Sequence, residues 1–270
     1  MRNRSENQIE NWRNAQTEIR LTLIRHGATL SNKEGRYLGK TEESLIRDGI
    51  RTLEKAVADG TYPTSGLVFS GPMKRCLETA QILYPKQTPI RIPEWTEMDF
   101  GAFEGHNYKE LSGDPAYQNW IDSGGTLPFP EGESREEFIR RSVAGYEDML
   151  HHIKMMWKEN PAFEQCNRDM EQRDPESIRR GESEAGDIRA RNTGIRSVSA
   201  VVHGGTIMAL LSHFLGGEYF DYQVKCGQGY RGILVFPADG GAPEWKGFRP
   251  LSELELSELR SSEFTEGETS

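Results

Sequence analysis

The chain reads I-R-L-T-L-I from Ile19 to Ile24 and continues directly with Arg25-His26-Gly27. Alternating apolar residues, rich in β-branched types, predict a β-strand over this stretch. In open α/β sheets, ligands bind at the carboxyl ends of the strands. The arginine and the histidine therefore stand where such a sheet would present functional side chains.

Two later stretches end in the same way. Ser197–Val202 predicts a second strand, which is followed by His203-Gly204-Gly205 and a helix. Gly66–Ser70 predicts a third strand, and a proline then opens a helix that carries Arg75. We expect the three strand ends to bring both histidines and both arginines to one edge of the sheet.

The remaining periodicity predicts helices that pack on this sheet. Helical spacing of apolar residues and helix-boundary signals predict helices at 49–58, 73–83, 133–157 and 205–214. Val224 and residues 233–236 are assigned to the closing strands. Strands that alternate with helices indicate an α/β fold with helices on both faces of a central sheet.

The pattern predicts one domain, from residue 19 to residue 250, preceded by a polar N-terminal extension at 1–18. Residues 164–196 are dense in Arg, Glu and Asp, which predicts a charged, flexible insertion. Residues 251–270 are acidic and rich in Ser and Glu, and we expect them to form a mobile tail.

The composition of the 270-residue chain supports a buried core, with 35% hydrophobic and 28% charged residues. The chain has 33 Lys and Arg against 42 Asp and Glu, a formal net charge of -9. This acidic balance argues against binding to nucleic acid through a basic surface. An anionic substrate would need a local cluster of positive groups.

The cysteines Cys76, Cys166 and Cys226 are scattered and form no CxxC pair, which argues against a disulfide framework and a cysteine zinc site. The first twenty residues contain no apolar stretch typical of a secretory signal. The longest apolar-rich run, Ile207–Leu215, is too short to span a bilayer. These features predict a cytoplasmic protein without a membrane partner, and they indicate no particular oligomeric state.

The residues at the strand ends fit the transfer of a phosphoryl group. Arginines such as Arg25 and Arg75 can each bind two phosphate oxygens with a planar guanidinium. A neutral imidazole at His26 can attack phosphorus and form a phosphohistidine, which divides one difficult step into two.

A carboxyl group and further donors complete this chemistry. Glu97 lies among apolar residues in the segment Trp95–Gly101 and can give a leaving alkoxide its proton. His203 as an imidazolium, and the backbone N–H of Gly204 at a helix N-terminus, can stabilise charge on the equatorial oxygens. The scheme needs no metal ion and no cofactor.

Six motifs, in order, resemble those of the histidine phosphatase superfamily, the phosphoglycerate mutase-like proteins. They are Arg25-His26-Gly27-Ala28-Thr29 with Asn32, Gly39 to Gly49, Pro72 to Ala80, Glu97 to Gly105, Pro130 to Ser134, and His203-Gly204-Gly205. The resemblance covers nearly the whole predicted domain and is strongest to the alpha-ribazole phosphatase and broad-specificity phosphatase branches. It implies a mostly parallel sheet with a small cap of helices and loops, drawn from 33–45 and 106–131.

The resemblance also implies a role for each residue. His26 is the phosphorylated nucleophile, and Glu97 acts first as the general acid and then as the base that activates water. The phosphate pocket and the other substrate-binding positions are Arg25, Asn32, Gly39, Arg75, His203 and Gly204. The implied activity is metal-independent hydrolysis of a phosphomonoester, and the implied partner is a small phosphorylated metabolite.

Three functions stay open at this point. Mutases of the family carry an arginine after the acid, where this chain has Met98 followed by Asp99. A carboxylate on the floor of the site disfavours a bisphosphorylated intermediate and favours a phosphatase. Leu38 stands where many members have serine or threonine, so one possible phosphate donor is absent, and Lys40 and Lys109 could compensate for it. We interpret Asp99 and Glu104 as structural or rim charges. The alternatives to a phosphatase are a phosphoglycerate mutase-type transfer and a non-catalytic module that binds a phosphorylated ligand.

Overall fold

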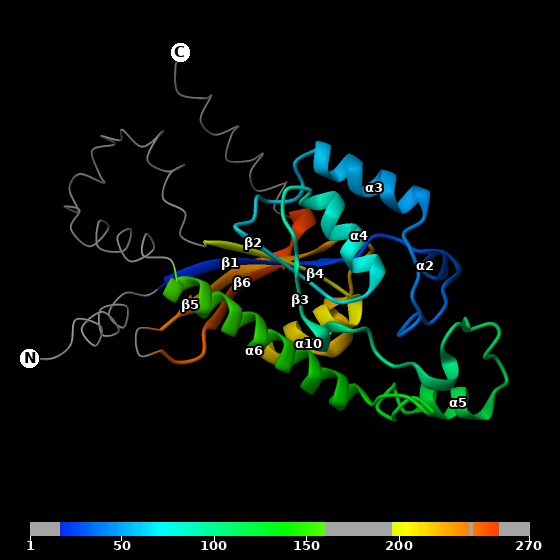
Figure 1. Cartoon of the computed structure of the whole chain (residues 1–270). Helices are drawn as coiled ribbons and strands as arrows, with labels where there is room; N and C mark the ends of the chain where they lie inside the picture. The colour runs from blue at the N-terminus through cyan, green and yellow to red at the C-terminus, as the bar shows by residue number, and fades with distance from the viewer. Residues whose placement is uncertain (1–16, 160–195, 238–239, 254–270) are drawn as a thin grey trace, which may run out of the picture.

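The computed structural model describes residues 17–159, 196–237 and 240–253, and these residues form an α/β fold (Figure 1). A six-stranded sheet with the strand order β3-β2-β4-β1-β5-β6 lies at its centre. The strands are β1 (Thr17–Arg25), β2 (Leu67–Ser70), β3 (Ile90–Arg91), β4 (Ser197–Val202), β5 (Gly229–Phe236) and β6 (Glu244–Pro250). Strands β1 to β4 are parallel to one another, β5 pairs antiparallel with β1, and β6 pairs antiparallel with β5, so the predicted mostly parallel sheet is confirmed.

The strand register places the predicted strand ends side by side. Arg25, the last residue of β1, pairs with Val202, the last residue of β4. Ser70, the last residue of β2, pairs with Val201. Because the three strands run in parallel, the residues that follow them emerge at the same edge of the sheet.

Helices cover both faces of the sheet, as predicted. The α-helices are α2 (Leu30–Glu34), α3 (Arg47–Ala58), α4 (Lys74–Leu83), α5 (Pro115–Asp122), α6 (Arg135–Glu159) and α10 (Gly204–Leu215). Short 3-10 turns are η2 (Pro93–Trp95), η3 (Gly101–Phe103) and η4 (Tyr219–Tyr222). In Figure 1, α3 and α4 lie on one face and α6 and α10 on the other. Each pair encloses its own buried apolar cluster against the central strands.

A third apolar cluster supports the cap beside the sheet. It contains Phe103 and Phe129, with Tyr37 and Trp120 packed against it. The two segments expected to form the cap meet here, because the Tyr37 N–H donates to the carbonyl of His106 over 2.9 Å. Helix α5 belongs to this region and lies at the end of the molecule in Figure 1.

Several boundaries differ from the sequence predictions. Thr17 and Glu18 extend β1 by pairing with β5, so the N-terminal extension ends earlier than residue 18. Val224 lies in the loop before β5 and not in a strand. Leu251, placed by the sequence in a mobile tail, is 2% exposed and packs in the cluster under α3 and α4.

Strands β3 and β6 carry weak sequence signals, and the sequence did not predict them. β3 has two residues, and β6 is an edge strand with no buried position. The remainder of the N-terminal extension, nearly all of the charged insertion and the rest of the acidic tail lie outside the described residues. No helix in the described ranges combines the length and the apolar composition needed to cross a membrane.

Candidate active site

His26 follows β1 directly and is 2% exposed. Its backbone N–H donates to the carbonyl of Val202 over 2.9 Å, which continues the β1–β4 pairing. The ring Nδ1 lies 2.7 Å from the Gly27 carbonyl and donates to it, so Nε2 carries the lone pair. Burial, followed by the charges of Arg75 and Arg25, lowers the pKa of His26 to about 3. The imidazole is therefore neutral over the physiological range, which is the form that a nucleophile requires.

Helix α4 is fastened to the loop that holds this histidine. The Gly27 N–H donates to the Thr79 hydroxyl over 2.9 Å, and that hydroxyl donates to the Arg75 carbonyl over 2.7 Å. Thr79 therefore links the nucleophile loop to the turn of α4 that carries Arg75. This contact gives a physical reason for a threonine four residues after the arginine.

The two predicted arginines each have one buried donor free for an anion. Arg25 donates from Nη1 to the Val224 carbonyl over 2.7 Å. Arg75 is fully buried and donates to the carbonyls of Thr41 (2.9 Å) and Gly39 (2.7 Å). The Nε of each arginine is buried and has no hydrogen-bond partner within the described residues. A phosphate oxygen would satisfy such a donor.

His203 lies beside His26 at the N-terminus of α10. The two rings are 5.2 Å apart between centroids and meet edge to face at 69°. Burial, with Arg75 and His26 as further causes, lowers the pKa of His203 well below its ordinary value. The protein groups alone therefore favour the neutral ring and not the predicted imidazolium. A phosphate dianion bound beside the ring would raise the pKa of His203 and favour the imidazolium.

Glu97 is buried next to His203, with 3.9 Å between its Oε2 and the His203 Nδ1. Burial raises the pKa of the Glu97 carboxyl, opposed by the Met98 N–H, which donates to Oε1 over 2.9 Å, and by the two arginines. The protonated form is thus favoured more than in an ordinary glutamate, as a general acid requires. A Cβ on Gly205 would lie 2.5 Å from Oε1, so a side chain at this position would displace the Glu97 carboxyl.

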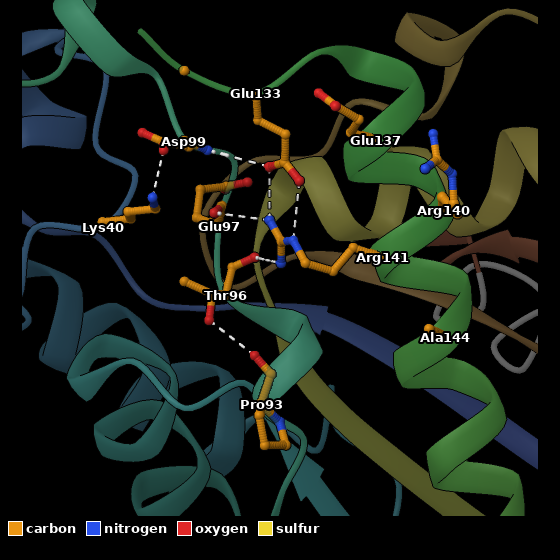
Figure 2. A pocket seen from close by; sticks show the side chains of 11 residues that line it. Lys40, Pro93, Thr96, Glu97, Asp99, Glu133, Glu137, Arg140, Arg141 and Ala144 are labelled. Atoms are coloured by element: carbon orange, nitrogen blue, oxygen red, sulfur yellow. Dashed lines mark hydrogen bonds and ion pairs between the residues drawn. The ribbon is translucent and has the colours of Figure 1, made fainter.

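The segment that carries Glu97 is held by Arg141 of α6 (Figure 2). Its guanidinium donates to the carbonyls of Thr96 (2.8 Å) and Glu97 (3.3 Å). It also donates to both carboxylate oxygens of Glu133, over 3.0 and 2.8 Å. Sequence reasoning missed this contact: Glu133 belongs to a quoted motif without an assigned role, and nothing distinguishes Arg141 from the other basic residues of its helix.

We expect the substitution Arg141→Met to lower kcat for an alkyl phosphate about 10- to 100-fold, because Glu97 would lose its fixed position. KM should change much less, since Arg141 does not line the cavity at Arg25. Loss of these bonds should also lower the free energy of unfolding by about 1–3 kcal/mol. The check is steady-state kinetics with thermal melting, with Arg140→Met on the same helix as the matched control. An Arg141→Met enzyme with the wild-type kcat would refute this positioning role.

Gly39 and Glu104 hold the loop that binds Arg75. Both carboxylate oxygens of Glu104 accept from the Gly39 N–H over 2.9 Å, and one of them also accepts from the Thr41 N–H over 3.0 Å. The N–H and the carbonyl of Gly39 are thus both engaged inside the protein, and a Cβ there would lie 2.2 Å from the Met98 carbonyl. Gly39 therefore supports Arg75, and the interpretation of Glu104 as a structural charge agrees with these contacts.

Asp99 does not line the cavity at Arg25, and the carboxylate that the sequence places on the floor of the site is neutralised by a partner. It is paired with Lys40 and accepts from the Gly101 N–H, and both charged residues line a second cavity on the α6 side, which Glu97 also lines (Figure 2). Burial acts to raise the pKa of Asp99, but Lys40 and the Gly101 N–H outweigh it and the net direction is downward. Lys109 stands over the Tyr108 ring, 5.9 Å from its centroid.

The other two predicted residues have different positions. The Asn32 side-chain oxygen accepts from the backbone and the hydroxyl of Thr29 over 3.1 Å each, in a capping box of α2. Gly204 begins α10 and lines a cavity of about 250 Å³ together with Arg25 and Glu97. The structure thus brings together Arg25, His26, Arg75, Glu97, His203 and Gly204, whereas Asn32 and Gly39 take part in supporting contacts. No group of three or more His, Cys, Asp or Glu side chains in the described ranges is placed to hold a metal ion.

Comparison with known proteins agrees with this geometry. The sequence pattern of the histidine phosphatase superfamily (branch 1) matches residues 21–156, half of the chain, and the protein belongs to this superfamily. The adenosylcobalamin/alpha-ribazole phosphatase of Escherichia coli is 29% identical over 145 residues, which cover 51% of this chain and 71% of that protein. The metal-independent phosphoserine phosphatase of Arabidopsis thaliana is 30% identical over 146 residues, covering 51% and 60%.

Solved structures share the fold. The alpha-ribazole phosphatase from Shigella flexneri superposes with a TM-score of 0.57 at 18% identity, covering 84% of this chain and 95% of that one. A phosphoserine phosphatase variant from Entamoeba histolytica, in complex with phosphoserine, superposes with a TM-score of 0.54 at 23% identity, covering 85% and 96%. The solved structures show the shared fold, and the two relatives from Escherichia coli and Arabidopsis thaliana are phosphatases, which supports a phosphatase activity for this chain.

Proposed function

We propose that the protein hydrolyses a small phosphomonoester in two steps, through a phosphohistidine at His26. The observation that carries the proposal is a buried, neutral imidazole set beside two arginines whose Nε donors have no partner among the described residues. These groups supply a nucleophile and the positive charge that a phosphate dianion needs. The phosphatases among the relatives support the same activity.

In the first step, Nε2 of His26 attacks phosphorus and the bond from phosphorus to the ester oxygen breaks. Glu97, whose raised pKa favours the protonated form, gives its proton to the leaving oxygen, so that a neutral alcohol departs. Arg25 and Arg75 bind the equatorial oxygens, and the N-terminus of α10 at Gly204 faces the same charge.

In the second step, the Glu97 carboxylate takes a proton from water while the water oxygen attacks phosphorus. The bond from phosphorus to His26 breaks, inorganic phosphate leaves, and the imidazole returns to its neutral form. Each group therefore ends the cycle in its starting state. A phosphorylated acceptor other than water would turn the same site into a mutase.

We expect release of inorganic phosphate from phosphomonoesters to continue at an unchanged rate in EDTA. The reason is that arginines, and not a metal ion, neutralise the phosphate in this scheme. The measurement is phosphate release from a panel of metabolites and from p-nitrophenyl phosphate, with and without chelator. Loss of activity in EDTA that a divalent ion restores would contradict the proposal, and transfer between positions of phosphoglycerate without net release would establish the mutase alternative.

A further inference from the structure

The lining of the cavity at Glu97 contains two kinds of residue. Arg25, Glu97 and Gly204 belong to the proposed reaction site and form what we call the polar end; Arg25 and Gly204 are adjacent, since a Cβ on Gly204 would lie 3.2 Å from the Arg25 Nε. The rest of the lining includes the large apolar and aromatic side chains of Phe100, Trp120, Phe129, Met208, Tyr219 and Phe220. The reaction proposed above uses only the polar end, so the aromatic end needs its own explanation.

We propose that the aromatic end is the subsite for the leaving alcohol, and that it selects an uncharged alcohol with a flat apolar group over phosphoserine and hydroxyl-rich alcohols. This inference rests on the proposed function, because the phosphoryl group must occupy the polar end. The two ends belong to one continuous cavity of about 250 Å³. An apolar cavity of roughly 150 Å³ already holds a benzene molecule, so a ring and a short linker fit.

The aromatic walls are held in place before any ligand binds. Trp120 stacks on Phe129 with 4.7 Å between ring centroids and an angle of 29°. Tyr219 meets Phe220 edge to face at 5.2 Å. Tyr219 is buried, whereas Phe220 is 47% exposed. Fixed rings lower the entropic cost of binding a flat ligand.

The charged groups of this lining offer the ammonium group of an amino-acid ester no carboxylate besides Glu97. Among the described residues that line the cavity, Glu97 alone carries a carboxyl group, and the mechanism uses that group protonated. Arg135 also lines the cavity, with its guanidinium 5.2 Å from the Tyr219 ring centroid and 5.0 Å from that of Phe220. The ammonium group of phosphoserine would find no second carboxylate in this lining, while its own carboxylate could pair with Arg135. The expected preference therefore rests on the apolar area that a flat ring buries against the aromatic side chains and that phosphoserine does not bury.

The test compares 2-phenylethyl phosphate with O-phosphoserine. Both are esters of primary alcohols, so the comparison depends mainly on binding of the alcohol. We expect kcat/KM to be at least about 10-fold higher for the phenylethyl ester, the effect of burying a large apolar group. Phe220→Ala should remove most of this preference by raising KM for the phenylethyl ester alone. Tyr108→Ala, at an exposed aromatic residue outside the cavity lining, is the matched control and should leave the preference intact.

Binding measured without turnover separates this inference from the proposed function. Calorimetry with 2-phenylethylphosphonate and with the phosphonate analogue of phosphoserine should give a dissociation constant at least about 10-fold lower for the former. Equal affinities, or an equal effect of Phe220→Ala on both ligands, would overturn the aromatic subsite. Absence of phosphate release from every ester would overturn the proposed function, while the phosphonate affinities would still decide the present inference.

Discussion

Replacing His26 with alanine is expected to lower kcat for phosphate release by more than about 100-fold, since loss of a nucleophile removes the covalent step altogether. The fold should remain, because within the described part of the chain the His26 side chain hydrogen-bonds only to the adjacent Gly27 carbonyl. His213→Ala, at an exposed histidine of α10, is the matched control and should retain full activity. Circular dichroism checks the fold of both variants. A His26→Ala enzyme that keeps more than about one-hundredth of the wild-type rate would contradict the assignment.

The same variant should change how stability depends on pH. In the folded protein His26 stays neutral down to about pH 3, whereas an unfolded imidazole titrates near 6.5. The unfolded chain therefore binds more protons below pH 6.5, and this group destabilises the fold as the pH falls from 6.5 toward 3. Between pH 7 and pH 5, His26→Ala should lose less unfolding free energy than the wild type, by about 2 kcal/mol. Denaturant titrations at the two pH values measure this difference.

The second large effect concerns Glu97, the proposed general acid. Glu97→Gln should slow phosphoryl transfer from an alkyl phosphate to His26 by about 100-fold or more, and should slow the same step for p-nitrophenyl phosphate far less. An alkoxide leaves only with a proton, whereas nitrophenolate leaves almost unaided. The comparison has to be made on the burst of alcohol release in rapid mixing, because Glu97 also activates water in the second step.

The pH dependence of that burst is an independent test of whether Glu97 acts as the general acid. Glu97 must be protonated to act, so the alkyl rate should fall as the pH rises through its raised pKa, and Glu97→Gln should lack this decline. Asp99→Asn is the matched control, since Asp99 lies on the same segment but is paired with Lys40 and does not line the cavity at Arg25. If both esters lose the same factor in Glu97→Gln, the leaving-group proton comes from another residue.

The central part of the fold and of the site could be predicted from sequence because the site residues directly follow parallel strands, which end at one edge of the sheet. Once Ile19–Ile24 and Ser197–Val202 are parallel strands, the residues after them must lie at one sheet edge. That single constraint places His26 and His203 together, although 177 positions separate them in the numbering of the chain. The two predicted helices that follow strands, at Arg75 and Gly204, extend the same constraint.

The supporting contacts could not be predicted, because they depend on side-chain direction and not on periodicity. Asp99 is adjacent to Met98 in sequence, yet it pairs with Lys40 in the α6 cavity, whereas Met98 lines the cavity at Arg25. Arg141 lies within a 25-residue helix rich in charge, and only tertiary packing brings it to the carbonyls behind Glu97. Leu251 was assigned to a mobile tail because residues 251–270 are acidic and rich in Ser and Glu, and that composition does not show that Leu251 packs under α3 and α4.

The most direct test of the account is to trap the intermediate. The enzyme is mixed rapidly with a phenyl ester that carries a radiolabelled phosphate, quenched in alkali because the bond between phosphorus and imidazole is labile in acid, and digested to locate the label. The account predicts an acid-labile, alkali-stable phosphate on His26 that forms during the burst and is missing from His26→Ala. A burst without a labelled protein, or a label on another residue, would contradict a phosphohistidine at His26.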